Sequence, residues 1–372
     1  MKKLRRKRTM NELDNYRKEI TETDEQMARL FEKRMQTVRK VAEYKKGRGL
    51  SILDPEREAQ IIEKNRALIT ESEIEGYYVS FLKNTIEQSR KYQSRLINGR
   101  RVAYSGVEGA FAYIAAKKLI PEGEYVACRD FATAYYGVEN GEFDCAVLPI
   151  ENSFAGEVGE VTDLLFSGSL YVNQVIELPV RHNLMAKKGA RLSDIKTVVS
   201  HPQAISQCSQ YIARRGFEIM NYSNTAAAAK LVKESDDPGV AAIASDETAE
   251  LFGLEIIEPD INDTRTNTTR FAVVSRQSDL PENRGINENS IIFFTVQNRA
   301  GALAQTLNII GAHGFNMKCL RSRPMKSLTW NYYFYVEIEG NLNSQNGREL
   351  LQELSALCER VKLAGTYSAD NT

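Results

Sequence analysis

The sequence predicts a multidomain chain with an all-helical domain, then an α/β domain, then a smaller α+β domain. Three observations predict this fold class. Apolar residues repeat every seven positions through residues 11–46, short β-type runs alternate with helical stretches after residue 100, and the last segment reads β, α, β, β, α, β. These patterns are typical of packed helices, of an open sheet covered by helices, and of a ferredoxin-like unit, respectively. With 372 residues, 42% of them hydrophobic, the chain has enough material for several cores.

The helical domain is predicted over residues 1–98. Its first helix, at about 11–46, is followed by a break at Gly47-Arg48-Gly49. A second helix is predicted to begin near Asp54-Pro55, because Asp can cap a helix and Pro favours its first turn. A third helix is predicted over about 74–96, and Asn98-Gly99 marks the end of the domain.

The seam of the first helix carries charges where apolar residues are expected. Asp24 can neutralise only one of the three cations Arg17, Arg34 and Lys45, and each unpaired buried charge costs roughly several kcal/mol. We therefore expect an anionic ligand inside a helical bundle. Arg34 and Lys45 lie roughly 16 Å apart along a helix, but Arg17 lies roughly 25 Å from Arg34, so Arg17 would serve a second copy in an antiparallel homodimer. The alternative is a surface helix whose cations extend into solvent.

The central α/β domain is predicted over residues 99–277. Its β-type runs lie at 101–104, 145–149, 197–200, 240–244 and 270–275, and ligands in such folds bind at the carboxyl ends of strands. Polar signatures lie at or near these positions: Gly106-Val107-Glu108-Gly109-Ala110-Phe111-Ala112, Pro149-Ile150-Glu151-Asn152-Ser153-Phe154-Ala155-Gly156, Ser200-His201-Pro202-Gln203, and Asn267-Thr268-Thr269-Arg270-Phe271. Taken singly, Asn-Ser or Ser-His-Pro indicates only a turn or a helix cap.

A polar linker at 278–289 is predicted to lead into the C-terminal domain at 290–372. Its strands are predicted at 290–297, 316–324, 330–338 and 361–367, and its helices at 300–313 and 344–357. At the start of the first of these helices, Gly301 would let backbone amides approach a carboxylate closely.

The composition argues against several functions. The net charge is zero and no stretch approaches the roughly 20 apolar residues of a membrane span, so we expect neither a nucleic-acid nor a membrane partner. The basic run at 2–8 is interpreted as a solvated tail. Because no apolar segment follows that run, it is not interpreted as a signal peptide, and a cytoplasmic location is expected. Cysteines and histidines are dispersed, which predicts reduced thiols and no metal, and no cofactor is expected. The GxGxxG pattern of a dehydrogenase is incomplete at both Gly106 and Gly47.

The helical domain resembles the all-helical chorismate mutases over nearly all of residues 11–93. The resemblance implies rearrangement of chorismate to prephenate, which needs cations around a dicarboxylate and no nucleophile. It implies that Arg34 and the partner subunit's Arg17 hold carboxylates, and that Lys45 and Gln93 contact the ether oxygen. Glu58 and Asp54 would take hydroxyl or positioning roles. The full set of matching residues is Arg17, Arg34, Lys45, Asp54, Arg57, Glu58, Ser89 and Gln93.

The four signatures of the central domain together resemble the prephenate dehydratases, whose two-lobed fold is like that of periplasmic binding proteins. The resemblance implies loss of hydroxyl and carbon dioxide from prephenate. Thr269 stands at the essential threonine of the family and is expected to donate a hydrogen bond to the leaving hydroxyl. His201 is interpreted as structural. The remaining expected substrate-binding residues are Glu151, Asn152, Ser153, Ser200, Gln207 and Arg270.

One signature departs from the family pattern. Val107 and Ala110 stand where the dehydratases usually have Gly-Pro-x-Gly followed by Ser or Thr, so a hydroxyl that could bind the substrate or the backbone is missing. Residues 106–112 are therefore the weakest part of the predicted site.

The C-terminal domain resembles ACT domains, which in this family pair between subunits to bind phenylalanine. Arg321 stands where the family commonly has Glu, and Ala304 where Val is common. A cation in place of a carboxylate near the expected pocket could weaken, alter or abolish phenylalanine control. The alternative is an ACT fold that serves only dimer contacts. The expected effector-binding residues are Gly301, Ala302, Leu303, Asn316, Ser322, Arg323 and Pro324.

These resemblances together predict a bifunctional enzyme of phenylalanine biosynthesis that converts chorismate to phenylpyruvate and is inhibited by phenylalanine. We expect a homodimer, or a tetramer if the ACT domains pair dimers. The alternative is a chorismate mutase fused to a non-catalytic sensor of an aromatic metabolite. Thr269 argues against the sensor, while Val107 and Ala110 favour it.

Overall fold

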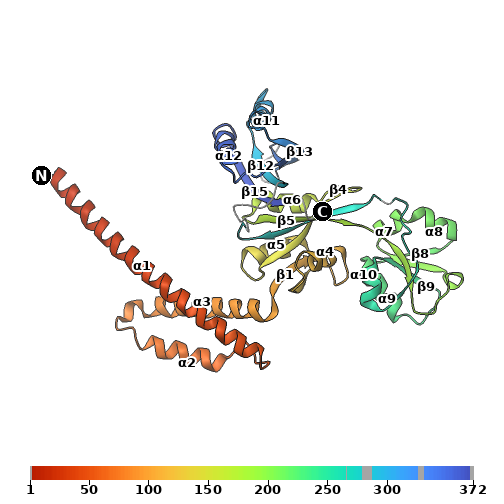
Figure 1. Cartoon of the computed structure of the whole chain (residues 1–372), viewed down its shortest axis with the longest axis horizontal. Helices are drawn as coiled ribbons and strands as arrows, with labels where there is room; N and C mark the ends of the chain where they lie inside the picture. The colour runs from red at the N-terminus through yellow and green to blue at the C-terminus, as the bar shows by residue number, and fades with distance from the viewer. Residues whose placement is uncertain (1, 265, 279–286, 326–330, 369–372) are drawn as a thin grey trace. The chain divides into compact units, whose positions relative to one another are not determined.

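The computed structural model describes residues 2–264, 266–278, 287–325 and 331–368, with only the backbone described for residues 2–11. The chain divides into two compact units, Met1–Gly99 and Arg100–Thr372 (Figure 1). Residues 279–286 of the predicted linker and Trp330 of a predicted strand lie outside the described residues.

The first unit is helical, with α1 at Lys2–Lys46, α2 at Pro55–Arg66 and α3 at Ser72–Asn98. The predicted start of α2 is confirmed, since the Asp54 side chain accepts a hydrogen bond from the Arg57 amide at 3.0 Å and Pro55 occupies the first turn. The basic run at 2–8 is part of α1, because Lys, Arg and Leu favour helix.

The seam of α1 is largely uncovered within one chain. Leu13, Ile20, Met27 and Phe31 are each at least 45% exposed. The buried apolar side chains that the structure describes in residues 12–99 are Ala42, Leu82 and Ile86. An exposed apolar stripe beside so small a core is typical of an interaction surface.

The second unit begins with a lobe built on a six-stranded sheet of order β2-β1-β3-β11-β5, with β4 paired to β3. Strand β11 runs antiparallel to both β3 and β5, and it returns to this sheet from the second lobe. The elements of this lobe are β1 (Arg100–Ser105), α4 (Phe111–Leu119), β2 (Gly123–Cys128), α5 (Phe131–Glu139), β3 (Cys145–Asn152), β4 (Gly156–Glu157), α6 (Gly159–Ser167), β5 (Tyr171–Pro179) and β11 (Thr268–Ser275).

The second lobe is built on a five-stranded sheet of order β10-β6-β9-β7-β8. Strands β1, β3, β7, β9 and β11 confirm the predicted β-type runs, and the two sheets confirm an α/β domain of two lobes. The elements of this lobe are β6 (Asn183–Ala186), η1 (Leu192–Asp194), β7 (Thr197–Ser200), α7 (Pro202–Gln207), α8 (Ser209–Arg215), β8 (Glu218–Asn221), α9 (Thr225–Glu234), β9 (Val240–Ala244), α10 (Asp246–Phe252) and β10 (Glu255–Glu258).

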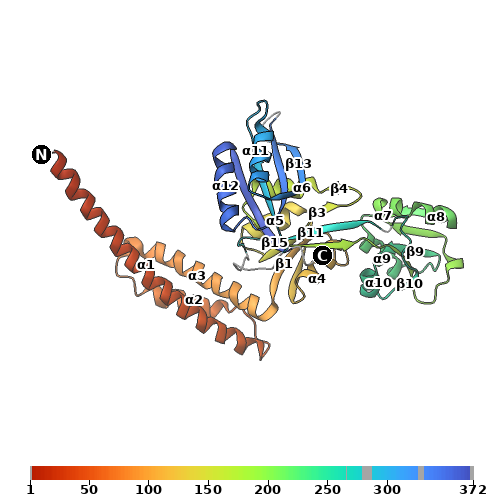
Figure 2. The ribbon, with the colours of Figure 1, turned by 45° about the horizontal axis from the view of Figure 1, so that its top comes forward.

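The C-terminal segment has the predicted βαββαβ order and forms a four-stranded sheet of order β13-β14-β12-β15. Helices α11 and α12 cover one face of this sheet (Figure 2). Phe293 and Tyr333 on the other face pack with Phe166 of α6 in one core with the first lobe. The elements are β12 (Glu288–Thr295), α11 (Ala302–Ala312), β13 (Asn316–Pro324), β14 (Tyr332–Glu339), α12 (Gln345–Leu357) and β15 (Arg360–Ser368).

Candidate active sites

Two of the predicted mutase residues meet between α1 and α3, and a third lies one turn further along α3. Arg34 of α1 donates a hydrogen bond to Ser89 Oγ and another to the Thr85 carbonyl at 3.4 Å, and Ser89 donates to the same carbonyl at 2.7 Å. Gln93, one turn beyond Ser89, is buried, and its Oε1 has no hydrogen-bond partner among the described residues. Burial lowers the pKa of Arg34. A partly desolvated cation is suited to an anionic ligand, and an unpaired buried amide oxygen is suited to a donor such as a hydroxyl.

Most of the other predicted mutase residues have local partners. Lys45 donates from Nζ to the Ile52 carbonyl at 2.8 Å, and Glu58 pairs with Arg90 of α3 at 3.3 Å. Asp54 caps α2, and Arg57 is exposed beside it. Arg17 extends into solvent and pairs with Asp14 at 3.5 Å. Within one chain, therefore, Arg17 is a solvent-exposed cation, which is what the surface-helix alternative predicts.

A cleft of about 490 Å³ is lined by residues from both lobes of the second unit. Asn152 and Thr269 line it from the ends of β3 and β11, and Gln207 lines it from α7. These are three of the predicted dehydratase residues. Other residues along the wall are Ala110, Phe111, His182, His201, Asn267 and Phe271.

Asn152 and Thr269 are partners in the β3–β11 ladder. The Asn152 Nδ2 donates to Thr269 Oγ1 at 2.9 Å and to Asn267 Oδ1 at 2.8 Å. Its Oδ1 accepts from the backbone amides of Phe154 and Ala155 at 3.0 and 2.8 Å, which fixes the orientation of the side-chain amide. Because Thr269 Oγ1 accepts from Asn152, the threonine keeps its own proton to donate to a group in the cleft.

His182 lines the same cleft, although the sequence analysis did not select it. Its ring is 2% exposed, lies edge-on to Phe111 with 5.9 Å between ring centroids, and places Nε2 2.9 Å from Gln207 Oε1. Burial lowers the pKa of His182, so the neutral ring is favoured. The amide oxygen of Gln207 then requires the proton on Nε2, which leaves Nδ1 as an acceptor without a partner in the described part of the chain.

Two serines predicted to bind substrate have their hydroxyls bonded to the backbone instead. Ser200 is fully buried and donates to the Ile243 carbonyl at 2.6 Å. Ser153 donates to the Thr266 carbonyl and accepts from the Thr268 amide, both at 2.9 Å. Neither serine lines the cleft. Their hydroxyls instead complete backbone hydrogen bonds that are left open where the strands end.

His201 caps α7 through Nδ1, which accepts from the Gln203 amide at 3.2 Å, as expected for a structural residue. In the first signature, Gly109 has φ +86°, and its carbonyl accepts a hydrogen bond from Thr248 of the second lobe at 2.9 Å. Ala110 lines the cleft, so the hydroxyl that the family pattern carries there is missing from the wall of the cleft.

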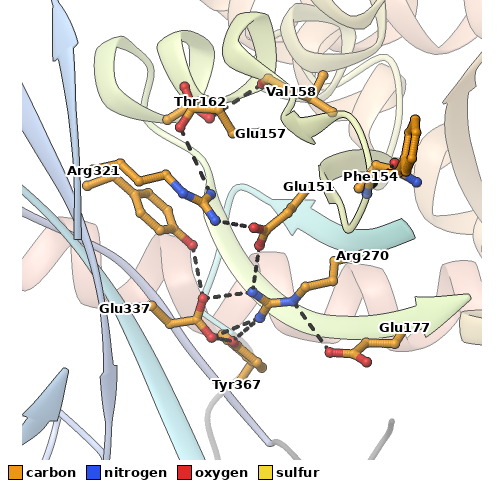
Figure 3. Close-up of polar contacts among 12 residues, drawn as sticks. Glu151, Phe154, Glu157, Val158, Thr162, Glu177, Arg270, Arg321, Glu337 and Tyr367 are labelled. Atoms are coloured by element: carbon orange, nitrogen blue, oxygen red, sulfur yellow. Dashed lines mark hydrogen bonds and ion pairs between the residues drawn. The ribbon is translucent and has the colours of Figure 1, made fainter. Parts of the chain in front are cut away.

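Arg270 and Glu151, also predicted to bind substrate, lie in a separate ionic cluster outside the cleft lining (Figure 3). Arg270 donates to both oxygens of Glu337 of β14 at 2.8 and 2.9 Å, to Tyr367 Oη of β15 at 2.7 Å, and to Glu151 at 3.3 Å. Burial opposes ionisation of Glu337, but the hydrogen bonds from Arg270 outweigh it and lower the pKa of this carboxyl. The alternation of side chains along β11 explains the placement, because Thr269 and Arg270 must face opposite ways.

Strand β13 carries predicted effector residues, but some of its side chains face the first lobe instead of a free surface. After a register shift between Met317 and Cys319, Arg321 pairs with Glu151, and Arg323 pairs with Glu157 and, at 3.1 Å, with Asp163. Both arginines therefore face the first lobe, while the alternate residues Ser322 and Pro324 are exposed. Arg323 is engaged within the chain rather than left for an effector, and Arg321 does not lie on the face of Ser322.

The remaining predicted effector residues lie at the start of α11 and of β13. Gly301 caps the start of α11 and has φ +79°, in the left-handed region that favours glycine. Ala302 is buried, and Leu303 packs against the core under the two helices. Asn316 donates to Glu339 at 2.7 Å.

Within the described residues, no group of three or more His, Cys, Asp or Glu is placed to hold a metal ion. None of the helices that the structure describes is both long and apolar enough to span a membrane.

Comparisons with known proteins match both units. Family models of chorismate mutase type II and prephenate dehydratase match residues 16–94 and 102–279. A bifunctional chorismate mutase/prephenate dehydratase of Enterobacter agglomerans is 31% identical over 97% of each chain. A chloroplastic arogenate dehydratase/prephenate dehydratase of Arabidopsis thaliana is 34% identical over 73% of this chain and 74% of its own. The structure of an Arthrobacter aurescens prephenate dehydratase in complex with L-Phe is 28% identical, covers 73% of this chain and 91% of that one, and has a TM-score of 0.66.

Proposed function

This chain belongs to the bifunctional chorismate mutase/prephenate dehydratase family and has both activities, and we propose that phenylalanine inhibits it through its C-terminal domain. Its substrates are chorismate and prephenate, and it acts in phenylalanine biosynthesis. The observation that carries our assignment of the second site is the Asn152–Thr269 pair at the wall of the interlobe cleft.

For the mutase reaction, we assign carboxylate binding to Arg34 and to the partner subunit's Arg17. Lys45 and Gln93 would stabilise the negative charge that develops on the ether oxygen as its bond breaks. The Arg34–Ser89 contact and the burial of Gln93 one turn beyond Ser89 support this placement of the site. The exposed seam of α1 supports an antiparallel homodimer, in which each long helix contributes to both sites.

For the dehydratase reaction, we assign Thr269 as the hydrogen-bond donor to the leaving hydroxyl. The bond between the ring and the carboxylate breaks to release carbon dioxide, and its electron pair enters the ring as the carbon–oxygen bond breaks. The departing hydroxide takes up one proton that comes from solvent and leaves as water. Threonine is a poor acid, so Thr269 would stabilise or relay this proton rather than supply it from a perturbed group.

For regulation, we propose that the C-terminal domain is an ACT domain that binds phenylalanine beside the start of α11 and the exposed face of β13. Backbone amides after Gly301 are suited to the effector carboxylate. Strand β13 supports a route to the dehydratase, because Arg321 and Arg323 on its other face pair with the first lobe. The phenylalanine complex of the Arthrobacter aurescens relative supports the choice of effector.

Purified protein incubated with chorismate, with and without phenylalanine, tests these assignments together. We expect prephenate to appear and then phenylpyruvate, with phenylpyruvate suppressed by phenylalanine. Phenylpyruvate that phenylalanine does not suppress would contradict the regulatory proposal alone. Prephenate without phenylpyruvate would favour the sensor alternative for the central domain. No consumption of chorismate would contradict the assignment of the helical site.

A further inference from the structure

The ionic cluster joins the C-terminal domain to the two strands that carry Asn152 and Thr269. In Figure 3, Glu151 lies between the guanidinium groups of Arg321 and Arg270. Arg321 comes from β13, whereas Glu151 and Arg270 come from β3 and β11. The cluster therefore connects three strands across a boundary between two sheets.

The pairing of β3 with β11 places this cluster directly beside the cleft. In that ladder Thr269 lies opposite Asn152, and the next rung places Arg270 opposite Glu151. Successive side chains on a strand point to opposite faces, so one rung presents Asn152 and Thr269 to the cleft while the next presents Glu151 and Arg270 to the C-terminal domain. A movement of the second rung must move the first, because the two rungs share their backbone.

Partners from the C-terminal domain hold the second rung in place. Glu337 is 1% exposed and accepts hydrogen bonds from both terminal nitrogens of Arg270. Tyr367 accepts a further hydrogen bond from the same guanidinium. Arg321 binds the other end of the rung, at Glu151. A bidentate carboxylate–guanidinium pair fixes both the distance and the orientation of its members.

We infer that Arg321 and Glu337 are positioning residues of the dehydratase site, acting through Glu151 and Arg270 on the Asn152–Thr269 hydrogen bond. This inference rests on the proposed role of Thr269. It gives Arg321 a function other than effector binding. It also explains how an arginine can replace the Glu that is common in the family, because Glu151 neutralises the charge of Arg321. A carboxylate at position 321 would repel Glu151 instead.

Arg321→Met in the full-length chain is the first test, since Arg321 is partly exposed and its removal leaves no fully buried charge. We expect the dehydratase kcat to fall about tenfold with little change in KM, because the substrate still binds but the donor is displaced. Arg321→Lys should restore most of the rate by restoring the charge. Mutase activity of the same preparation serves as an internal control and should be unchanged.

Arg360→Met is a matched control. Arg360 also joins the C-terminal domain to the first lobe, because it donates a hydrogen bond to the Phe166 carbonyl of α6 at 3.0 Å. Among the described residues, however, it has no contact with either rung. Its dehydratase kcat should stay within about twofold of the wild type. Wild-type kcat in Arg321→Met, or an equal loss in Arg360→Met, would overturn the inference. Glu337→Gln, which keeps the shape but loses the charge, should lower kcat as Arg321→Met does.

A second readout does not depend on turnover. In protein labelled with ¹⁵N-asparagine, Arg321→Met should shift the side-chain amide resonances of Asn152, assigned with Asn152→Asp, and Arg360→Met should leave them in place. Unshifted Asn152 resonances in Arg321→Met would overturn the inference. A wild-type chain that forms no phenylpyruvate would contradict the proposed function alone, and these resonances would still decide whether Arg321 positions Asn152.

Discussion

Asn152 donates a hydrogen bond from Nδ2 to Oγ1 of Thr269 at 2.9 Å, across paired positions of two antiparallel strands. The Asn152 amide is itself oriented by two backbone amides of the loop that follows it. The threonine oxygen therefore accepts this hydrogen bond while the hydroxyl proton stays available. This is the polarity that a donor to a leaving hydroxyl requires.

Thr269→Val should abolish most dehydratase activity while leaving mutase activity intact. Removal of one donor to a developing oxyanion typically costs about 100-fold to 1,000-fold in kcat. The measurement is phenylpyruvate formation from prephenate, with chorismate consumption as the control. Thr268→Val is the matched substitution, because the neighbouring threonine does not line the cleft, and it should be nearly neutral. Survival of dehydration in Thr269→Val would exclude Thr269 as the donor.

Asn152→Asp keeps the shape of the side chain but reverses its hydrogen-bonding role toward Thr269. A carboxylate accepts where the amide donated, so the threonine proton should turn toward Asp and away from the substrate. We expect the dehydratase kcat to fall about 100-fold. Steady-state assays on prephenate, with thermal denaturation to verify folding, give the comparison. A rate near that of the wild type would show that the direction of this hydrogen bond is unimportant.

Mixing Arg17→Ala protein with Arg34→Ala protein should restore mutase activity that each variant lacks alone. In an antiparallel dimer with shared sites, a hybrid has one site that lacks both arginines and one intact site. With random exchange, about half of the dimers are hybrids, so about one quarter of the wild-type activity should return. Subunit exchange is verified with two affinity tags. No recovery after verified exchange would exclude shared sites.

The stability of the second unit should fall on acidification in a way that depends on His182. Burial lowers the pKa of this histidine below its ordinary value of 6.5, so the unfolded chain takes up a proton at a higher pH than the folded chain does. The resulting contribution is complete above about pH 6.5 and is lost as the pH falls below that value. Urea denaturation from about pH 5 to pH 7.5 should give a shallower dependence for His182→Gln than for the wild type. Parallel curves would show that His182 titrates alike in both states.

The element order could be predicted because its signals are local. Asp54-Pro55 identifies the start of α2 by itself, and the alternation of strands and helices requires no knowledge of distant contacts. Thr269, Asn152 and Gln207 were selected from a family resemblance, and all three line the cleft. Their positions at strand ends and on α7 follow from the element order.

Other parts of the site depend on which face of a strand a residue occupies. Thr269 and Arg270 are consecutive, so strand alternation allows only one of them to face the cleft, although both were predicted to bind substrate. For β13 no such rule was available, because the register shift near Met317 that sets the faces of Arg321 and Ser322 has no sequence signal that we can identify. His182 was missed because a single histidine between two strands has no recognisable motif; its partner, Gln207, is close only in the folded chain.

Dilution should act on the two halves of this chain differently. In our proposal, a second copy of the chain covers the apolar stripe along α1 that is formed by Leu13, Ile20, Met27 and Phe31. The wall of the interlobe cleft, in contrast, comes from a single chain. By mass action, the first reaction would weaken as subunits separate, and the second would persist. The ratio of the two rates would then depend on how much of the protein a cell makes.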